Sequence, residues 1–169
     1  MIPIRGALML VATAALTAFG AAGDDPKVNK LPDKAKSILD MANQFDLLSL
    51  DPDAGRDQTK DAFHGWKVLG KTVVKDPKVR KQILESLYEG ISKSDGQGAK
   101  CFEPRHGIRA SVEGKTVDLV VCFECSWVYV FFDKDENRQG VAVTTYKPQA
   151  NWDKALRDAG VALPKQTKK

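Results

Sequence analysis

The feature that most constrains this chain is the segment of residues 101–132, CFEPRHGIRASVEGKTVDLVVCFECSWVYVFF. It holds all three cysteines, one of the two histidines and the longest apolar run after the N-terminal region. From residue 117 to residue 131 the odd-numbered positions are apolar throughout, whereas the even-numbered ones include Asp118, Glu124 and Ser126. Successive side chains of a strand point to opposite faces. The pattern therefore predicts β-structure with its odd face on the core.

The length of this run leaves its chain path open. Strands usually have about 5–6 residues, which favours a break near residues 124–126, but no Gly, Pro or Asn is present there to turn the chain. We therefore expect one long strand over residues 116–132, with a bulge. In a regular strand, Cys122 and Cys125 would lie about 10 Å apart on opposite faces. A disulfide needs Cα atoms within roughly 7 Å, so these cysteines can share a bond or a metal only if the chain bends between them.

Residues 1–23 have the form of a secretory signal peptide. Arg5 is the only charge, residues 7–19 are apolar, and small residues follow at positions 20–23. The apolar run is shorter than the roughly 20 residues of a membrane span. The sequence thus predicts an exported protein, periplasmic or extracellular, with no stable membrane span after cleavage and an environment where disulfides persist.

The remaining chain predicts one domain. Residues 24–31 are expected to be a linker, residues 32–164 the domain, and residues 165–169 a disordered basic tail. Apolar periodicity and end signals predict helices over residues 32–44, 77–88 and 151–159, with Gly90 ending the second. Strands are expected over residues 45–50, 63–74, 108–112 and 141–146. The return strand of a hairpin, residues 115–122, follows a turn at residues 113–114 and continues into the long run described above. The fold class is therefore α+β, an antiparallel sheet of about four to six strands with helices packed on one face.

The cysteines and His106 allow several kinds of site. In an exported protein we expect a structural disulfide from Cys101 to Cys122 or to Cys125, with the third cysteine buried. The alternative is a zinc site formed by Cys101, His106, Cys122 and Cys125, because three thiols and an imidazole suit tetrahedral zinc. Zinc ribbons usually have Gly or Pro in both knuckles, and neither residue is present between Cys122 and Cys125.

Two reactive alternatives involve the same residues. Cys122 and Cys125 form a C-x-x-C motif, the spacing of thioredoxin-like redox sites, but the residues that follow have a strand pattern instead of the helix that lowers a thiol pKa there. Cys101 as a nucleophile with His106 as its base is a further possibility, although nothing nearby orients the histidine.

The segment of residues 104–109, PRHGIR, is a candidate anion site through Arg105 and Arg109. A polar loop that leads into a strand is the simpler interpretation. The net charge of +4 falls to +3 without Arg5 and is spread evenly along the chain. Nucleic-acid binding usually needs a concentrated basic face, so we expect no nucleic-acid partner.

The two cysteine segments also resemble a pattern in uncharacterised bacterial exported proteins. The pattern is C-[FY]-x-P-R-H followed by C-F-x-C, and it matches Cys101, Phe102, Pro104, Arg105 and His106, and then Cys122, Phe123 and Cys125. The resemblance covers about thirty residues and implies no known function. It supports treating the two segments as one unit.

The sequence leaves the partner, the ligand and the oligomeric state open. We expect a non-enzymatic exported domain, a binding or envelope-associated protein stabilised by a Cys101 disulfide and lacking a cofactor. The alternative is a zinc-binding or thiol-redox protein that uses Cys101, His106, Cys122 and Cys125.

Overall fold

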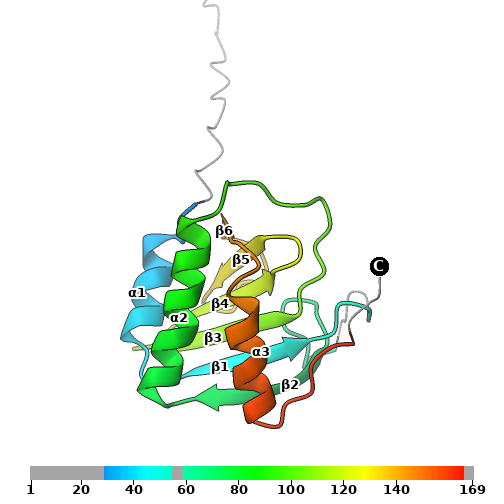
Figure 1. Ribbon diagram of the computed structural model, residues 1–169. Helices are drawn as coiled ribbons and strands as arrows, with labels where there is room; N and C mark the ends of the chain where they lie inside the picture. Colours follow the sequence, from blue (N-terminus) through cyan, green and yellow to red (C-terminus); the bar gives the residue numbers. More distant parts are fainter. Residues whose placement is uncertain (1–28, 55–58, 166–169) are drawn as a thin grey trace, which may run out of the picture.

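Six strands and three helices form the part of the chain that the computed structural model describes, residues 29–54 and 59–165 (Figure 1). In chain order the elements are α1 (Asp33–Met41), β1 (Phe45–Leu50), β2 (Val68–Val74), α2 (Pro77–Ser92), β3 (His106–Val112), β4 (Lys115–Cys122), β5 (Trp127–Phe132), β6 (Gly140–Val143) and α3 (Gln149–Asp158). The strands form one antiparallel sheet, so the predicted α+β class is confirmed.

The strands follow the order β2-β1-β3-β4-β5-β6 across the sheet. β3 and β4 are joined by the expected two-residue turn, in which Glu113 and Gly114 have positive φ angles of 50° and 78°. Two successive positive φ values match the right-handed twist of the flanking strands, the usual solution for a tight hairpin. In the strand order, β4 lies in the middle of the sheet, between β3 and β5.

All three helices pack on one face of the sheet, in front of it in the view of Figure 1. The main core forms between them and the sheet, where alternate strand residues meet the apolar stripes of the helices. Its largest fully buried side chains include Trp152, Phe45, Leu39, Leu47, Ile83, Leu87, Ile108, Leu119 and Leu156. This one-sided arrangement confirms the predicted packing of helices on a single face.

The opposite face, which we call the open face, has a smaller apolar cluster. Its buried members are Leu48, Leu50, Phe63, Val120 and Phe131. Phe63 and the half-buried Trp66 come from the segment between β1 and β2, and Phe102 comes from the segment between α2 and β3. These connecting segments thus cover part of the face that has no helices.

The expected single strand over residues 116–132 is wrong, because the chain turns at residues 123–126 and forms the separate strands β4 and β5. Ser126 adopts a φ of 64°, and its N–H donates to the Phe123 carbonyl at 3.2 Å. A left-handed residue other than Gly or Asn is uncommon. The turn was missed because its φ-positive position is occupied by serine.

Other element boundaries also differ from those predicted. β2 begins at Val68 instead of residue 63, because residues 63–66 form a tight turn with His64 at φ 51°. β6 ends at Val143 instead of residue 146, because the Thr145 N–H donates to the Gly90 carbonyl on α2 at 3.1 Å. The first helix ends at Met41, where Ala42 becomes extended.

Gly90 lies inside α2 and does not end it. A Cβ at this position would lie 2.6 Å from Thr144 Oγ1 and 2.7 Å from Pro148 Cγ. Glycine is needed here for close approach between α2 and the segment that follows β6. The predicted start of this helix is confirmed, since Asp76 Oδ1 accepts hydrogen bonds from the N–H groups of Lys78 and Val79.

Several predicted features lie outside the described residues, namely the signal peptide at residues 1–23, the linker up to residue 28 and the tail from residue 166. Leu31 falls in the predicted linker of residues 24–31, but it is 4% exposed and belongs to the main core, so this boundary of the prediction is wrong. Among the residues that the structure describes, no helix has the length and apolar character required to cross a membrane.

Candidate functional site

The three cysteines converge at the turn between β4 and β5. Cys122 and Cys125 form a disulfide, with Cα atoms 5.2 Å apart. The Cys101 thiol donates a hydrogen bond to Cys125 Sγ across 3.1 Å. Cys101 lies in the segment before β3, 24 residues from Cys125, so the fold brings the two predicted cysteine segments together.

The disulfide joins a different pair from either of the expected ones. Cys101 was predicted to bond Cys122 or Cys125, whereas the structure leaves it as a free thiol. The reason is the turn at residues 123–126, which brings Cys122 and Cys125 within the roughly 7 Å limit that a regular strand would exceed. The C-x-x-C motif thus occupies a hairpin turn and not the start of a helix.

The loop that carries Cys101 is fixed to the same turn by hydrogen bonds. The Ala99 N–H donates to the Cys125 carbonyl at 3.0 Å, and Trp127 Nε1 donates to the Ala99 carbonyl at 2.7 Å. Gly98 lies against the Trp127 ring, where a Cβ would come within 2.2 Å of Cε2. These contacts hold the Cys101 segment against the disulfide.

The residue after Cys101 anchors the loop from the other side. The Phe102 ring stacks on Tyr129 of β5 with centroids 3.8 Å apart and meets Trp66 edge-on at 6.0 Å. Arg138 also lies over the Tyr129 ring, with its guanidinium carbon 4.3 Å from the ring centroid. Cys101 is thus held between a hydrogen-bonded loop and an aromatic stack on the open face.

The three cysteines differ in their exposure to solvent. Cys122 and Cys125 are each 1% exposed, whereas Cys101 is half-buried. A molecule from solution therefore reaches Cys101 before it reaches the disulfide.

His106 does not join the cysteines. It pairs with Val121 in the β3–β4 ladder and lies on the helix-covered side, where its ring contacts Phe123 and Trp152 edge-on. Cys122 follows Val121 and thus faces the opposite side of the sheet. The described residues contain no group of three or more His, Cys, Asp or Glu side chains arranged to hold a metal ion. The four predicted zinc ligands therefore have no common centre, and Cys101 lacks the predicted histidine base.

Arg105 and Arg109 make contacts in different parts of the molecule. Arg105 is 5% exposed, donates through Nη1 to the Lys165 carbonyl at 2.9 Å, and has Nε 3.4 Å from Glu124 Oε1. Arg109 faces the open side and binds Asp118 through Nε and Nη2. The two guanidinium groups do not form the single anion site considered from the sequence.

A buried cluster on the open face was missed by the sequence analysis. Asp118, 2% exposed, accepts hydrogen bonds from Arg109 and contacts His64 Nε2 at 2.7 Å. Burial alone would raise the pKa of the Asp118 carboxyl, but the hydrogen bonds from Arg109 and His64 outweigh it and hold that pKa below its usual value. Since 54 residues separate His64 from Asp118, no local spacing marks this contact.

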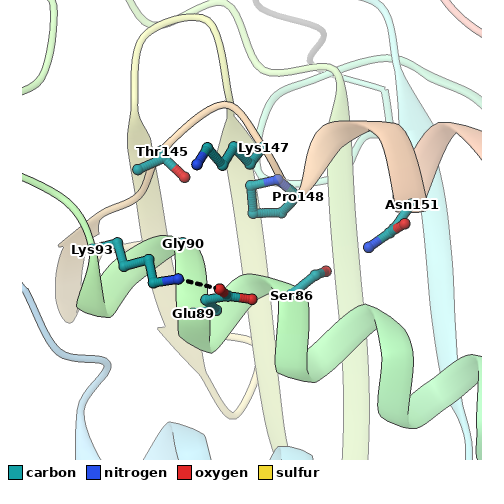
Figure 2. Close-up of a pocket in the computed structure, with 8 residues that line it drawn as sticks. All are labelled: Ser86, Glu89, Gly90, Lys93, Thr145, Lys147, Pro148 and Asn151. Carbon is teal, nitrogen blue, oxygen red and sulfur yellow. Dashed lines mark hydrogen bonds and ion pairs between the residues drawn. The ribbon is translucent and has the colours of Figure 1, made fainter.

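A small pocket of about 120 Å³ lies between the C-terminal half of α2 and the segment that joins β6 to α3 (Figure 2). Figure 2 shows Lys93 bonded to Glu89 on one side and Lys147 and Thr145 on the other. None of the candidate site residues predicted from the sequence lies in it.

The site therefore consists of a half-buried thiol beside a buried disulfide, on a hairpin turn of an antiparallel sheet. Comparison of the chain with protein-family models, with curated proteins and with solved structures finds no match.

Proposed function

We propose that this protein is an exported thiol–disulfide exchange protein in which Cys101 is the reactive thiol. The observation that carries the proposal is the distance of 3.1 Å between Cys101 Sγ and Cys125 Sγ, the latter bonded to Cys122. A thiolate attacks a disulfide sulfur directly, so a third sulfur in contact with one member of the pair is already close to a reactive position.

The first step is an exchange within the protein. The Cys101 thiolate attacks Cys125 Sγ, the Cys122–Cys125 bond breaks, and its electron pair stays on Cys122 as a thiolate. The result is a Cys101–Cys125 disulfide with a free Cys122. The number of disulfides is unchanged, so this step requires neither an oxidant nor a reductant.

The second step transfers the disulfide to a partner with two thiols. A partner thiolate attacks Cys101 Sγ, which forms a mixed disulfide and releases Cys125 as a thiolate. The second partner thiolate then attacks the partner's sulfur in that bond and releases Cys101. The partner gains one disulfide, and the protein is left with three thiols. Oxidation of these thiols by another disulfide restores the starting state.

The difference in exposure between the cysteine residues supports this order. Cys122 and Cys125 are each 1% exposed and cannot be approached without rearrangement, whereas Cys101 is half-buried. Cys101 therefore connects the solvent with a disulfide that is otherwise protected. The predicted signal peptide supports an oxidising compartment, in which such a disulfide is maintained.

The test is single-turnover transfer to a peptide that contains two reduced cysteines, followed by mass spectrometry. The oxidised mature protein should form about one equivalent of peptide disulfide. Cys101→Ser keeps the Cys122–Cys125 disulfide and should react only at the rate of the background oxidation. Thermal unfolding of both proteins checks that the substitution leaves the fold intact. Transfer by Cys101→Ser at the wild-type rate would contradict the proposal.

The second candidate function is a non-enzymatic exported binding domain. The burial of Cys122 and Cys125 favours it, since inert structural cysteines are usually buried. In that case the wild-type protein transfers no disulfide to the peptide, and Cys101 can be alkylated without any change in cysteine pairing.

A further inference from the structure

We propose that the pocket between α3 and the start of β3 binds a small monocarboxylate with a short aliphatic chain. The pocket has a volume of about 220 Å³. Its polar lining comprises Arg105, His106, Glu124, Gln149, Asp153 and Arg157. It lies on the helix-covered side of the sheet, so this inference is independent of the proposed thiol chemistry.

The inner wall of the pocket carries a buried positive charge. The Arg105 side chain is 6% exposed, and its guanidinium is held by the Lys165 carbonyl and by Glu124. Arginine has five N–H donors in a fixed planar arrangement, so these contacts also fix its orientation. The 3.4 Å contact between Glu124 Oε1 and Arg105 Nε partly neutralises the Glu124 carboxylate.

The second acidic group in the pocket is also engaged. His106 Nε2 lies 2.8 Å from Asp153 Oδ1, and because a carboxylate can only accept, Nε2 carries the proton. His106 is 1% exposed, which makes it a rigid partner for Asp153. Both carboxylates of the pocket are therefore bound to a basic side chain.

The outer wall, formed by α3, has two polar side chains that are not bound to another side chain of the described residues, Gln149 and Arg157. Gln149, Asp153 and Arg157 follow one another at intervals of four residues on α3, so they lie along one face of the helix. Within residues 29–54 and 59–165, the Arg157 guanidinium and the Gln149 amide make no hydrogen bond or ion pair. Arg157 is exposed at the mouth of the pocket and is available to bind a carboxylate with two parallel hydrogen bonds.

The available guanidinium selects the ligand class. Glu124 contacts Arg105 and Asp153 contacts His106, so Arg157 is the basic side chain of the lining that is left to bind a ligand. A ligand with one negative charge matches it. A cation would meet an unpaired guanidinium, and a phosphate dianion would bring a second charge close to Glu124 and Asp153.

The size and the remaining lining define the rest of the ligand. Leu163 and Pro164 from the C-terminal segment supply an apolar wall. A volume of about 220 Å³ is below the roughly 300–1,000 Å³ of sites for drug-sized molecules, so it suits a ligand of only a few carbon atoms. Butyrate combines these properties and is the first probe to use.

The test is titration of the mature protein, followed by two-dimensional NMR of its backbone amides. Butyrate should produce saturable shifts near residues 105–106 and 149–157, whereas butylamine and inorganic phosphate should not. Arg157→Gln should weaken butyrate binding roughly tenfold, the effect expected for loss of a charge-assisted hydrogen bond. Arg157 is exposed, so this variant should fold normally.

Two matched variants separate a specific site from general electrostatics. Lys154→Gln removes a positive charge from α3 outside the pocket, where Lys154 pairs with Asp158, and should leave butyrate binding unchanged. Glu124→Gln removes a competing carboxylate and should tighten it. Equal weakening by Lys154→Gln and Arg157→Gln, equal binding of butylamine or phosphate, or the absence of saturable shifts would each overturn the proposal.

Discussion

Asp118 and Arg109 face each other as register partners in β4 and β3, and the Asp118 carboxylate accepts hydrogen bonds from Arg109 Nε at 2.8 Å and Nη2 at 2.6 Å. The same carboxylate contacts His64, whose ring stacks on Phe131 with centroids 3.8 Å apart. Asp118 thus fixes the turn at residues 63–66 to the open face of the sheet.

The first prediction concerns the stability that this contact contributes. Asp118→Ala should lower the free energy of unfolding by about 3 kcal/mol, the low end of the range for removal of one partner from a buried pair. The low end applies because the Arg109 side chain is 43% exposed and can regain water. Asp46→Ala on β1 is the control, since Asp46 pairs with the exposed Lys71 and should contribute only about 0–1 kcal/mol. Denaturant unfolding measures both, and equal losses would contradict the prediction.

The lowered pKa of Asp118 predicts a pH dependence with a definite sign. A carboxyl whose pKa is lower in the folded state contributes stability that is complete above its unfolded pKa of about 3.9. This contribution is lost as the pH falls through the folded pKa. The stability difference between wild type and Asp118→Asn should therefore shrink as the pH decreases from about 5 to 3. Chemical unfolding at each pH tests it, and a constant difference would be the contrary result.

Gly90→Ala should destabilise the protein, although the same change in an exposed helix interior stabilises by roughly 1 kcal/mol. The added Cβ would lie 2.6 Å from Thr144 Oγ1 and 2.7 Å from a ring carbon of Pro148. Overpacking of this kind typically costs about 1–3 kcal/mol. Thermal or denaturant unfolding decides the sign, and a rise in stability would mean that the segment after β6 moves away freely.

The sequence was sufficient for the fold class because most elements have a clear period and clear ends. The apolar stripe of α2 and its Asp76 cap predicted that helix, and the Glu113–Gly114 turn predicted the β3–β4 hairpin. Local patterns of this kind depend on residues only a few positions apart. They were enough to predict an antiparallel sheet with helices on one face.

The wrong predictions have physical causes that local sequence patterns do not contain. Ser126 adopts a left-handed conformation in a turn where Gly or Asn would be expected, so the turn and the Cys122–Cys125 disulfide were both missed. Gly90 resembled a helix stop because its role in packing depends on residues more than fifty positions away. The proximity of Cys101 to Cys125 was a hypothesis that needed the tertiary fold for its geometry.

Metal analysis gives a further prediction for the cysteines. The oxidised protein, purified without a histidine tag, should contain no stoichiometric zinc. A cysteine must be a thiolate to bind zinc, and the sulfur atoms of Cys122 and Cys125 are consumed in a disulfide. His106 is bound to Asp153 on the other side of the sheet. One equivalent of zinc that disappears in Cys101→Ser would contradict this expectation and support the zinc alternative.

The last prediction uses the loop lengths of the two disulfides. In Cys122→Ser, the sulfur atoms of Cys101 and Cys125 lie 3.1 Å apart in the wild-type geometry, so they should form a disulfide under oxidising conditions. That bond closes a loop with a sequence separation of 24, whereas the Cys122–Cys125 bond has a separation of 3. Because a longer closed loop removes more entropy from the unfolded chain, oxidation should stabilise the variant by about 1–2 kcal/mol more than it stabilises the wild type.

This comparison is made within each protein, between its oxidised and reduced forms, so the cost of placing serine at position 122 cancels. Mass spectrometry after alkylation of free thiols identifies the pairing, and denaturant unfolding of both forms measures the gain. If Cys122→Ser keeps both remaining thiols free under conditions that oxidise the wild type, Cys101 cannot reach Cys125. The intramolecular exchange step would then be impossible, because it requires the same bond to form.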